Sequence, residues 1–128
     1  MESKDQTLQQ RVAAWVEKCF GLSLLLDRKE RGLRVLEEAA ELAQALGCSQ
    51  AQCAGTLAYV FSRPIGVPSQ EVGGVATTVL AACAAIGEDF ETLAEREVLV
   101  LGFFHGKGEA TDHDPASHGR TTAALCAR

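Results

Sequence analysis

Residues 33–46 read LRVLEEAAELAQAL, and their apolar members recur every three or four positions. This spacing predicts an amphipathic helix from about Lys29 to Leu46. Gly47 follows directly, as is typical of a helix end. The face expected to be buried comprises Leu33, Leu36, Ala39, Ala40, Ala43 and Leu46.

Three carboxylates interrupt this helix, at Glu37, Glu38 and Glu41. Residues three apart share a helix face, so we expect Glu38 and Glu41 to point the same way. A fourth carboxylate, Glu71, stands in the next strongly apolar stretch. An oxygen-only set of this kind suits Mg²⁺ or Mn²⁺ rather than a thiolate or imidazole metal. One alternative is that Glu37, Glu38 and Glu41 form a solvated helix face paired with Arg34 and Gln44. Glu71 could instead be a first-turn residue that interacts favourably with the N-terminus of its helix.

The rest of the chain also reads as helical. Apolar spacing predicts a first helix from Leu8 to about Cys19, with Gly21 at its end. Ser49 and Gln52 form a capping-box pattern that opens another helix. The prolines and glycine between Arg63 and Pro68 require a loop.

Two helices are expected after that loop. Residues 69–86 are almost uncharged after Glu71, and a helix that is apolar all round is typically buried, so we expect a central helix here. Asp89 can cap a last helix, with a short strand at Val98–Phe104 as the alternative. The prediction is therefore an all-α bundle of four to five helices over residues 1–104, followed by a polar and disordered tail over residues 105–128.

Composition narrows the class of protein. The chain has 128 residues, and its formal net charge of −5 argues against a nucleic-acid partner, since no basic cluster is present. The longest leucine run, Leu24–Leu26, is too short to cross a membrane. Five cysteines without a CxxC pair favour reduced thiols, and so we expect a cytoplasmic protein.

The pattern from Arg31 to Val98 resembles the MazG-like all-α nucleoside triphosphate pyrophosphohydrolases, in a phage-type or mobile-element-type branch. Those proteins carry an ExxE pair on one helix and an ExxD pair on the next. Here Glu38-Ala39-Ala40-Glu41 matches the first pair and Glu71 the start of the second, whereas Gly74 stands where the Asp is expected. The resemblance implies hydrolysis of a nucleoside triphosphate to the monophosphate and pyrophosphate by a homodimer.

The resemblance also implies roles for individual residues. Glu38, Glu41 and Glu71 would hold Mg²⁺, or alternatively Mn²⁺, and Glu37 or Glu41 would act as the base toward water. From their positions in the chain rather than from the resemblance, Arg31 and Arg63 are candidate contacts to the substrate phosphates, with ordinary surface charge as the alternative. Gly74 is a candidate contact because a ligand could need the space that a side chain would fill, with close helix packing as the alternative. Two alternatives stay open: a catalytically silent relative that binds nucleotide, because Gly74 replaces a carboxylate, and a helical protein-interaction module from a mobile element.

Overall fold

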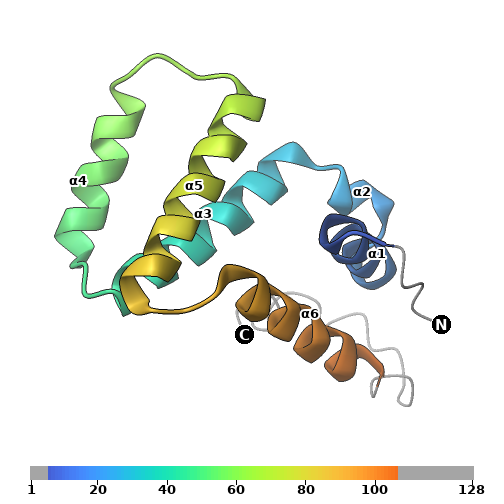
Figure 1. The fold of residues 1–128 in the computed structure, drawn as a ribbon. Helices are drawn as coiled ribbons and strands as arrows, with labels where there is room; N and C mark the ends of the chain where they lie inside the picture. The colour runs from blue at the N-terminus through green and yellow to red at the C-terminus, as the bar shows by residue number, and fades with distance from the viewer. Residues whose placement is uncertain (1–5, 107–128) are drawn as a thin grey trace. The chain divides into compact units, whose positions relative to one another are not determined.

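The computed structural model describes residues 6–106, and this part of the chain is helical with no strand. The six helices are α1 (Leu8–Phe20), α2 (Leu22–Leu25), α3 (Arg28–Ala45), α4 (Gln50–Phe61), α5 (Pro68–Ile86) and α6 (Phe90–Gly106), as Figure 1 shows. The all-α prediction is confirmed. The strand alternative at Val98–Phe104 is wrong, because α6 continues through it. Residues 107–128 of the predicted tail lie outside the described part.

The chain divides into two units, and each is described by itself. Unit 1 comprises residues 1–31 and 91–128, and unit 2 comprises Gly32–Phe90. The boundary falls inside α3, so the first turn of that helix belongs to unit 1. The residues with predicted roles lie in unit 2, except Arg31.

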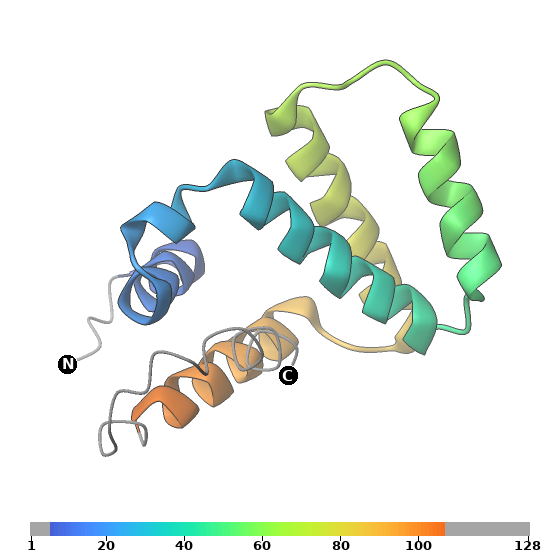
Figure 2. The same ribbon diagram turned by 180° about the vertical axis from the view of Figure 1, so that it is seen from behind.

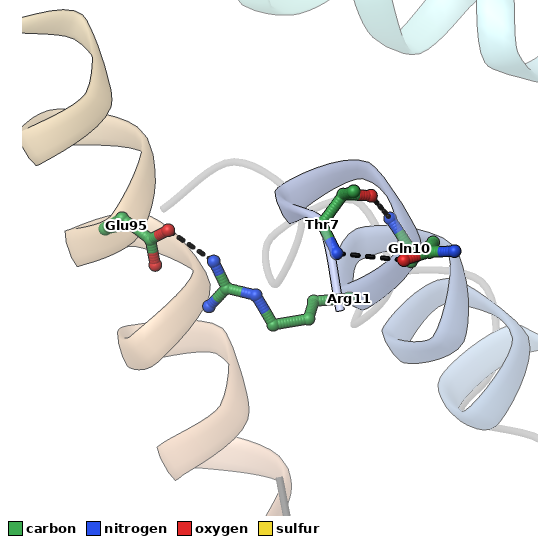
Figure 3. Close-up of polar contacts among 4 residues, drawn as sticks. All are labelled: Thr7, Gln10, Arg11 and Glu95. Atoms are coloured by element: carbon green, nitrogen blue, oxygen red, sulfur yellow. Dashed lines mark hydrogen bonds and ion pairs between the residues drawn. The ribbon is translucent and has the colours of Figure 1, made fainter. Parts of the chain in front are cut away.

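Unit 1 begins with a capping box that the sequence pattern did not bring out (Figure 3). The Thr7 backbone N–H donates to Gln10 Oε1 at 2.9 Å, and the Gln10 N–H donates to Thr7 Oγ1 at 3.2 Å. These bonds satisfy backbone groups that a helix start otherwise leaves without partners. Arg11 of α1 forms an ion pair with Glu95 of α6.

The aromatic residues of α1 belong to a small packed cluster. The rings of Trp15 and Phe20 meet edge to face, with centroids 5.6 Å apart, and the neighbouring Val16 is 5% exposed. Edge-to-face packing of this kind is a favourable aromatic geometry. The two rings therefore have a structural explanation within unit 1.

Local signals explain the ends of the helices that contribute to unit 2. Asp27 Oδ1 accepts hydrogen bonds from the Lys29 and Glu30 backbone N–H groups at the start of α3. The predicted capping box at Ser49 and Gln52 is present at the start of α4. Gly87 ends α5 in the left-handed region, with a φ of 71°, where glycine has no Cβ penalty.

Helices α4 and α5 run antiparallel and are joined by residues 62–67 (Figures 1 and 2). The expectation that α5 is a buried central helix is wrong within the chain, because Cys83 is its only buried side chain. The predicted buried face of α3 is also wrong, since Leu33 is 54% exposed and Leu36 is 43% exposed. The physical reason is that the helices of unit 2 do not enclose a core between them.

Helix α5 has the length and composition of a membrane-crossing helix, but these properties are weak evidence, because core helices of water-soluble proteins share them. Core helices are mostly buried, whereas only 6% of the apolar window of α5 is buried inside the chain. The apolar surface of this helix is therefore not accounted for by packing within unit 2.

Candidate functional site

A groove of about 720 Å³ runs between α3 and α5 in unit 2. Its volume lies within the range of about 300–1,000 Å³ that is usual for small-molecule sites. One wall is formed by residues of α3 and of the segment that follows it, and these residues recur every three or four positions. The other wall is formed by α5. The lining residues are Arg34, Val35, Glu38, Ala39, Leu42, Ala43, Leu46 and Cys48 on the first wall and Val75, Thr78 and Val79 on the second.

The groove has a charged part and an apolar part. Arg34 and Glu38 are its only charged lining residues, and they lie one helical turn apart on α3. The remaining lining is mainly aliphatic. A ligand with one ionic end and one flat or apolar end matches this division, since apolar walls supply burial and a few polar groups fix orientation.

Glu37 lies beside this groove and is already paired. Its Oε2 accepts a hydrogen bond from Arg34 Nη1, three residues earlier on α3, and its side chain is 34% exposed. This is the Arg34 pairing that the sequence allowed as the alternative to a catalytic role. Any action of Glu37 on a water molecule would have to compete with that ion pair.

Glu41 lies on a different surface from Glu38. It lines a second, smaller hollow of about 300 Å³ with Ala40, Gln44 and residues at the start of α4, including Gln50 and Cys53. Both glutamates are exposed. The expectation that they face one cation is thus not realised in this arrangement, because three residues along a helix also turn the side chain by about 60°.

Glu71 stands in the first turn of α5, and its carboxylate folds back over Gly66 in the preceding loop. A Cβ at Gly66 would collide with that carboxylate. Glycine is therefore the residue that allows Glu71 to adopt this position. In this conformation Glu71 covers the loop and is not among the residues that line the groove.

The three predicted substrate contacts have different surroundings. Arg63 places its guanidinium carbon 5.3 Å from the centre of the Tyr59 ring, a cation–π arrangement at the end of α4. Arg31 is half-buried, and its Nε has no hydrogen-bond partner among the described atoms. Gly74 has open space, since an added Cβ would meet nothing within 4 Å.

The three-carboxylate cage expected for Mg²⁺ is not formed. Among the residues that the structure describes, no group of three His, Cys, Asp or Glu side chains lies close enough to hold a metal. The side chains have the right chemistry but do not converge. Glu38 is the one carboxylate among the residues that line the groove. Mg²⁺ commonly combines one or two protein carboxylates with phosphate oxygens and water.

Sequence reasoning missed the apolar lining of the groove. Val75 and Val79 are four residues apart on α5 and face the same way as Thr78. That spacing was visible in the sequence, but it predicted a buried helix face rather than the wall of an open groove. Only the placement of α3 beside α5 distinguishes a buried helix face from the wall of a groove.

Comparison of this chain with models of protein families, with curated proteins and with solved structures finds no match.

Proposed function

We propose that this chain hydrolyses a nucleoside triphosphate to the monophosphate and pyrophosphate, with Mg²⁺ or Mn²⁺, as a homodimer. The observation that carries the proposal is the groove between α3 and α5, where Glu38 of the ExxE pair and Arg34, one helical turn away, are the charged residues of a mainly aliphatic lining. The triphosphate would occupy the charged part, and the base would lie against the aliphatic walls.

The charges at the groove suit such a substrate. A bound Mg²⁺ would supply charge compensation for the triphosphate and the departing pyrophosphate. Glu38 would hold the ion from the α3 side, and Arg34, which is paired with Glu37 in this structure, would exchange or share that partner with a phosphate oxygen. Glu41 and Glu71 would join Glu38 only after their side chains move toward it.

Two binding modes compete with hydrolysis, and each has an observation in its favour. Gly74 offers no carboxylate where the ExxD pattern has one, which favours a silent nucleotide binder. The exposed apolar side chains of α4 and α5 favour a helical interaction module. Gly74 has room for a larger side chain, so Gly74→Asp is a direct test of the first alternative.

The test is pyrophosphate release from a panel of canonical and modified ribo- and deoxyribonucleoside triphosphates, with Mg²⁺ or Mn²⁺. The variant is Glu38→Gln, and the matched control is Glu17→Gln, an exposed acid on α1 that is not among the groove-lining residues. The proposal expects turnover in the native chain and the control but not in Glu38→Gln. Thermal stabilisation by Mg²⁺ and triphosphate without turnover would instead support the silent binder.

A gain of turnover in Gly74→Asp over an inert native chain would identify the missing carboxylate as the cause. If the native chain and Gly74→Asp are both inert and neither is stabilised by nucleotide, the interaction module is the better account.

A further inference from the structure

Two free cysteines line the smaller hollow of unit 2. Cys48 and Cys53 both belong to its lining, together with Glu41, and the hollow has a volume of about 300 Å³. Cys48 is exposed, and Cys53 is partly exposed. The other free cysteines of the described residues, Cys19 and Cys83, line neither this hollow nor the groove. Cys48 and Cys53 are therefore two thiols that open to one solvent-accessible space.

The start of α4 explains why these two thiols share a surface. In the capping box, the Ser49 N–H donates to Gln52 Oε1 at 2.8 Å, and the Gln52 N–H donates to Ser49 Oγ at 3.2 Å. Cys48 directly precedes this N-cap, and Cys53 is the fourth residue of α4. Side chains at these two positions often pack against each other as a hydrophobic staple. A free thiol packs as a small apolar group, so the pair fits that arrangement.

Backbone hydrogen bonds hold both cysteines in place. The Cys48 N–H donates to the Ala43 carbonyl at 3.0 Å, at the end of α3. The Cys53 N–H donates to the Ser49 carbonyl at 3.1 Å, in the first turn of α4. The pairing of the two thiols is thus determined within the short segment that joins α3 to α4.

We propose that Cys48 and Cys53 form a reversible disulfide by exchange with a small disulfide of the glutathione class. The Cys48 thiolate attacks one sulfur of that disulfide, whose S–S bond breaks and releases one glutathione thiolate. The Cys53 thiolate then attacks the Cys48 sulfur of the mixed disulfide and releases the second glutathione. Two protein thiols are oxidised, one glutathione disulfide is reduced to two thiols, and the two cysteine protons pass to the released glutathiones.

Exposure assigns the order of the two steps. Cysteines that react with oxidants are typically solvent-accessible and lie next to a second cysteine that resolves the first product. Cys48 is the more exposed thiol, and Cys53 is the resolving one. Disulfides of this transient kind also occur in reducing compartments, where they act as redox sensors. Cys48 is the only residue that lines both the hollow and the groove, so the bridge forms where these two surfaces meet.

The experiment is peptide mass mapping of the intact chain after incubation with oxidised glutathione. Remaining thiols are blocked with N-ethylmaleimide, and the chain is then cleaved after glutamate, which yields residues 42–71 with Cys48 and Cys53 and no other cysteine. The expected mass of this peptide is that of the reduced form less two hydrogen atoms, with no maleimide and no glutathione attached. An excess of reduced glutathione is expected to restore the two thiols.

The buried Cys83 is the internal control, because the same cleavage places it alone in residues 72–88, where no glutathione is expected. A peptide 42–71 that keeps both thiols, or that carries glutathione without a bridge, would overturn the proposal. A disulfide that joins two chains through Cys48 in place of the internal bridge would also overturn it.

Two variants test the order of the steps. Cys53→Ser removes the resolving sulfur, so Cys48 is expected to retain one glutathione that the native chain releases. In Cys48→Ser, the less exposed Cys53 is expected to take up glutathione about tenfold more slowly. Equal rates in the two variants, with the helical circular dichroism signal intact, would contradict the role of Cys48 as the attacking thiol. None of these outcomes depends on nucleotide hydrolysis.

Discussion

Helices α3 and α5 are nearly equal in length, with 18 and 19 residues, and both are largely exposed, but their compositions are opposite. Eight of the α3 residues carry charge, whereas Glu71 is the only charged residue in α5. Water solvates an exposed charged helix readily, but it does not solvate an apolar one without cost. Exposure to water therefore costs α3 little free energy, and this helix is suited to face solvent and an ionic ligand. Exposure is costly for α5, which is suited to contact a protein surface.

The largest expected effect concerns the charged helix. Glu38→Gln keeps the size of the side chain but removes the charge that would hold the cation at the groove. We expect turnover to fall about 100- to 1,000-fold, as for the loss of one preorganised electrostatic group in other enzymes. Initial rates of pyrophosphate release at saturating metal measure this, and an unchanged rate in Glu38→Gln would remove the groove from the proposed chemistry.

The next effect distinguishes glycines in the two helices. Gly32 in α3 and Gly73 in α5 both have open space around an added Cβ. In a chain that acts alone, alanine at either position should stabilise by about 1 kcal/mol. If a second copy packs at α5, we expect Gly32→Ala to stabilise and Gly73→Ala to destabilise by about 1–3 kcal/mol through overpacking.

Chemical denaturation at a fixed protein concentration provides the two free energies of unfolding. Equal stabilisation by Gly32→Ala and Gly73→Ala would show that nothing packs closely at Gly73. It would contradict the claim that α5, unlike α3, contacts a protein surface.

A smaller effect tests the start of α4. Ser49→Ala removes the hydroxyl that accepts from the Gln52 N–H, so one backbone donor loses its partner. The expected loss is about 1 kcal/mol. Thr7→Ala, which removes the equivalent hydroxyl from α1, is the matched comparison in unit 1. Thermal unfolding of both variants measures the losses, and a loss confined to Thr7→Ala would mean that the cap of α4 contributes nothing.

The smallest effect involves the ion pair of Arg11 and Glu95. The hydrogen bond from Arg11 lowers the pKa of the Glu95 carboxyl below its ordinary value. A lowered pKa stabilises the folded state above the ordinary carboxyl pKa, and this contribution disappears as the pH falls through the lowered value. Glu95→Gln should therefore lower the midpoint of thermal unfolding slightly near pH 7 and leave it unchanged near pH 2.

Unfolding curves at the two pH values, repeated at high salt, provide the check on that ion pair. High salt should shrink the difference near pH 7, since exposed pairs are screened. A difference that is equal at both pH values would assign the effect to something other than the charge of Glu95.

Short-range patterns were sufficient to predict most of the helices. The capping box at Ser49, the break between Arg63 and Pro68 and the terminal Gly21 each act within a few residues, so they could be predicted directly. The short helix α2 was not predicted, because four residues leave no measurable periodicity.

Burial could not be predicted in the same way. Apolar spacing in α5 shows that the helix has a surface to bury but not whether the covering surface belongs to the same chain. The arrangement of the site could not be predicted from spacing either. Spacing placed Glu38 and Glu41 on one helix, but the positions of α4 and α5 determine that the two side chains line different hollows. The position of the Glu71 side chain over Gly66 likewise depends on the loop conformation.

Amide hydrogen exchange tests most directly whether α3 faces a ligand and α5 faces a protein surface. It is measured for both helices in the intact chain, at low and high protein concentration, with and without Mg²⁺ and a triphosphate. We predict that α5 gains protection as the protein concentration rises, independently of nucleotide, and that α3 gains protection when nucleotide binds. Equal and unprotected exchange of the two helices under all four conditions would contradict both assignments.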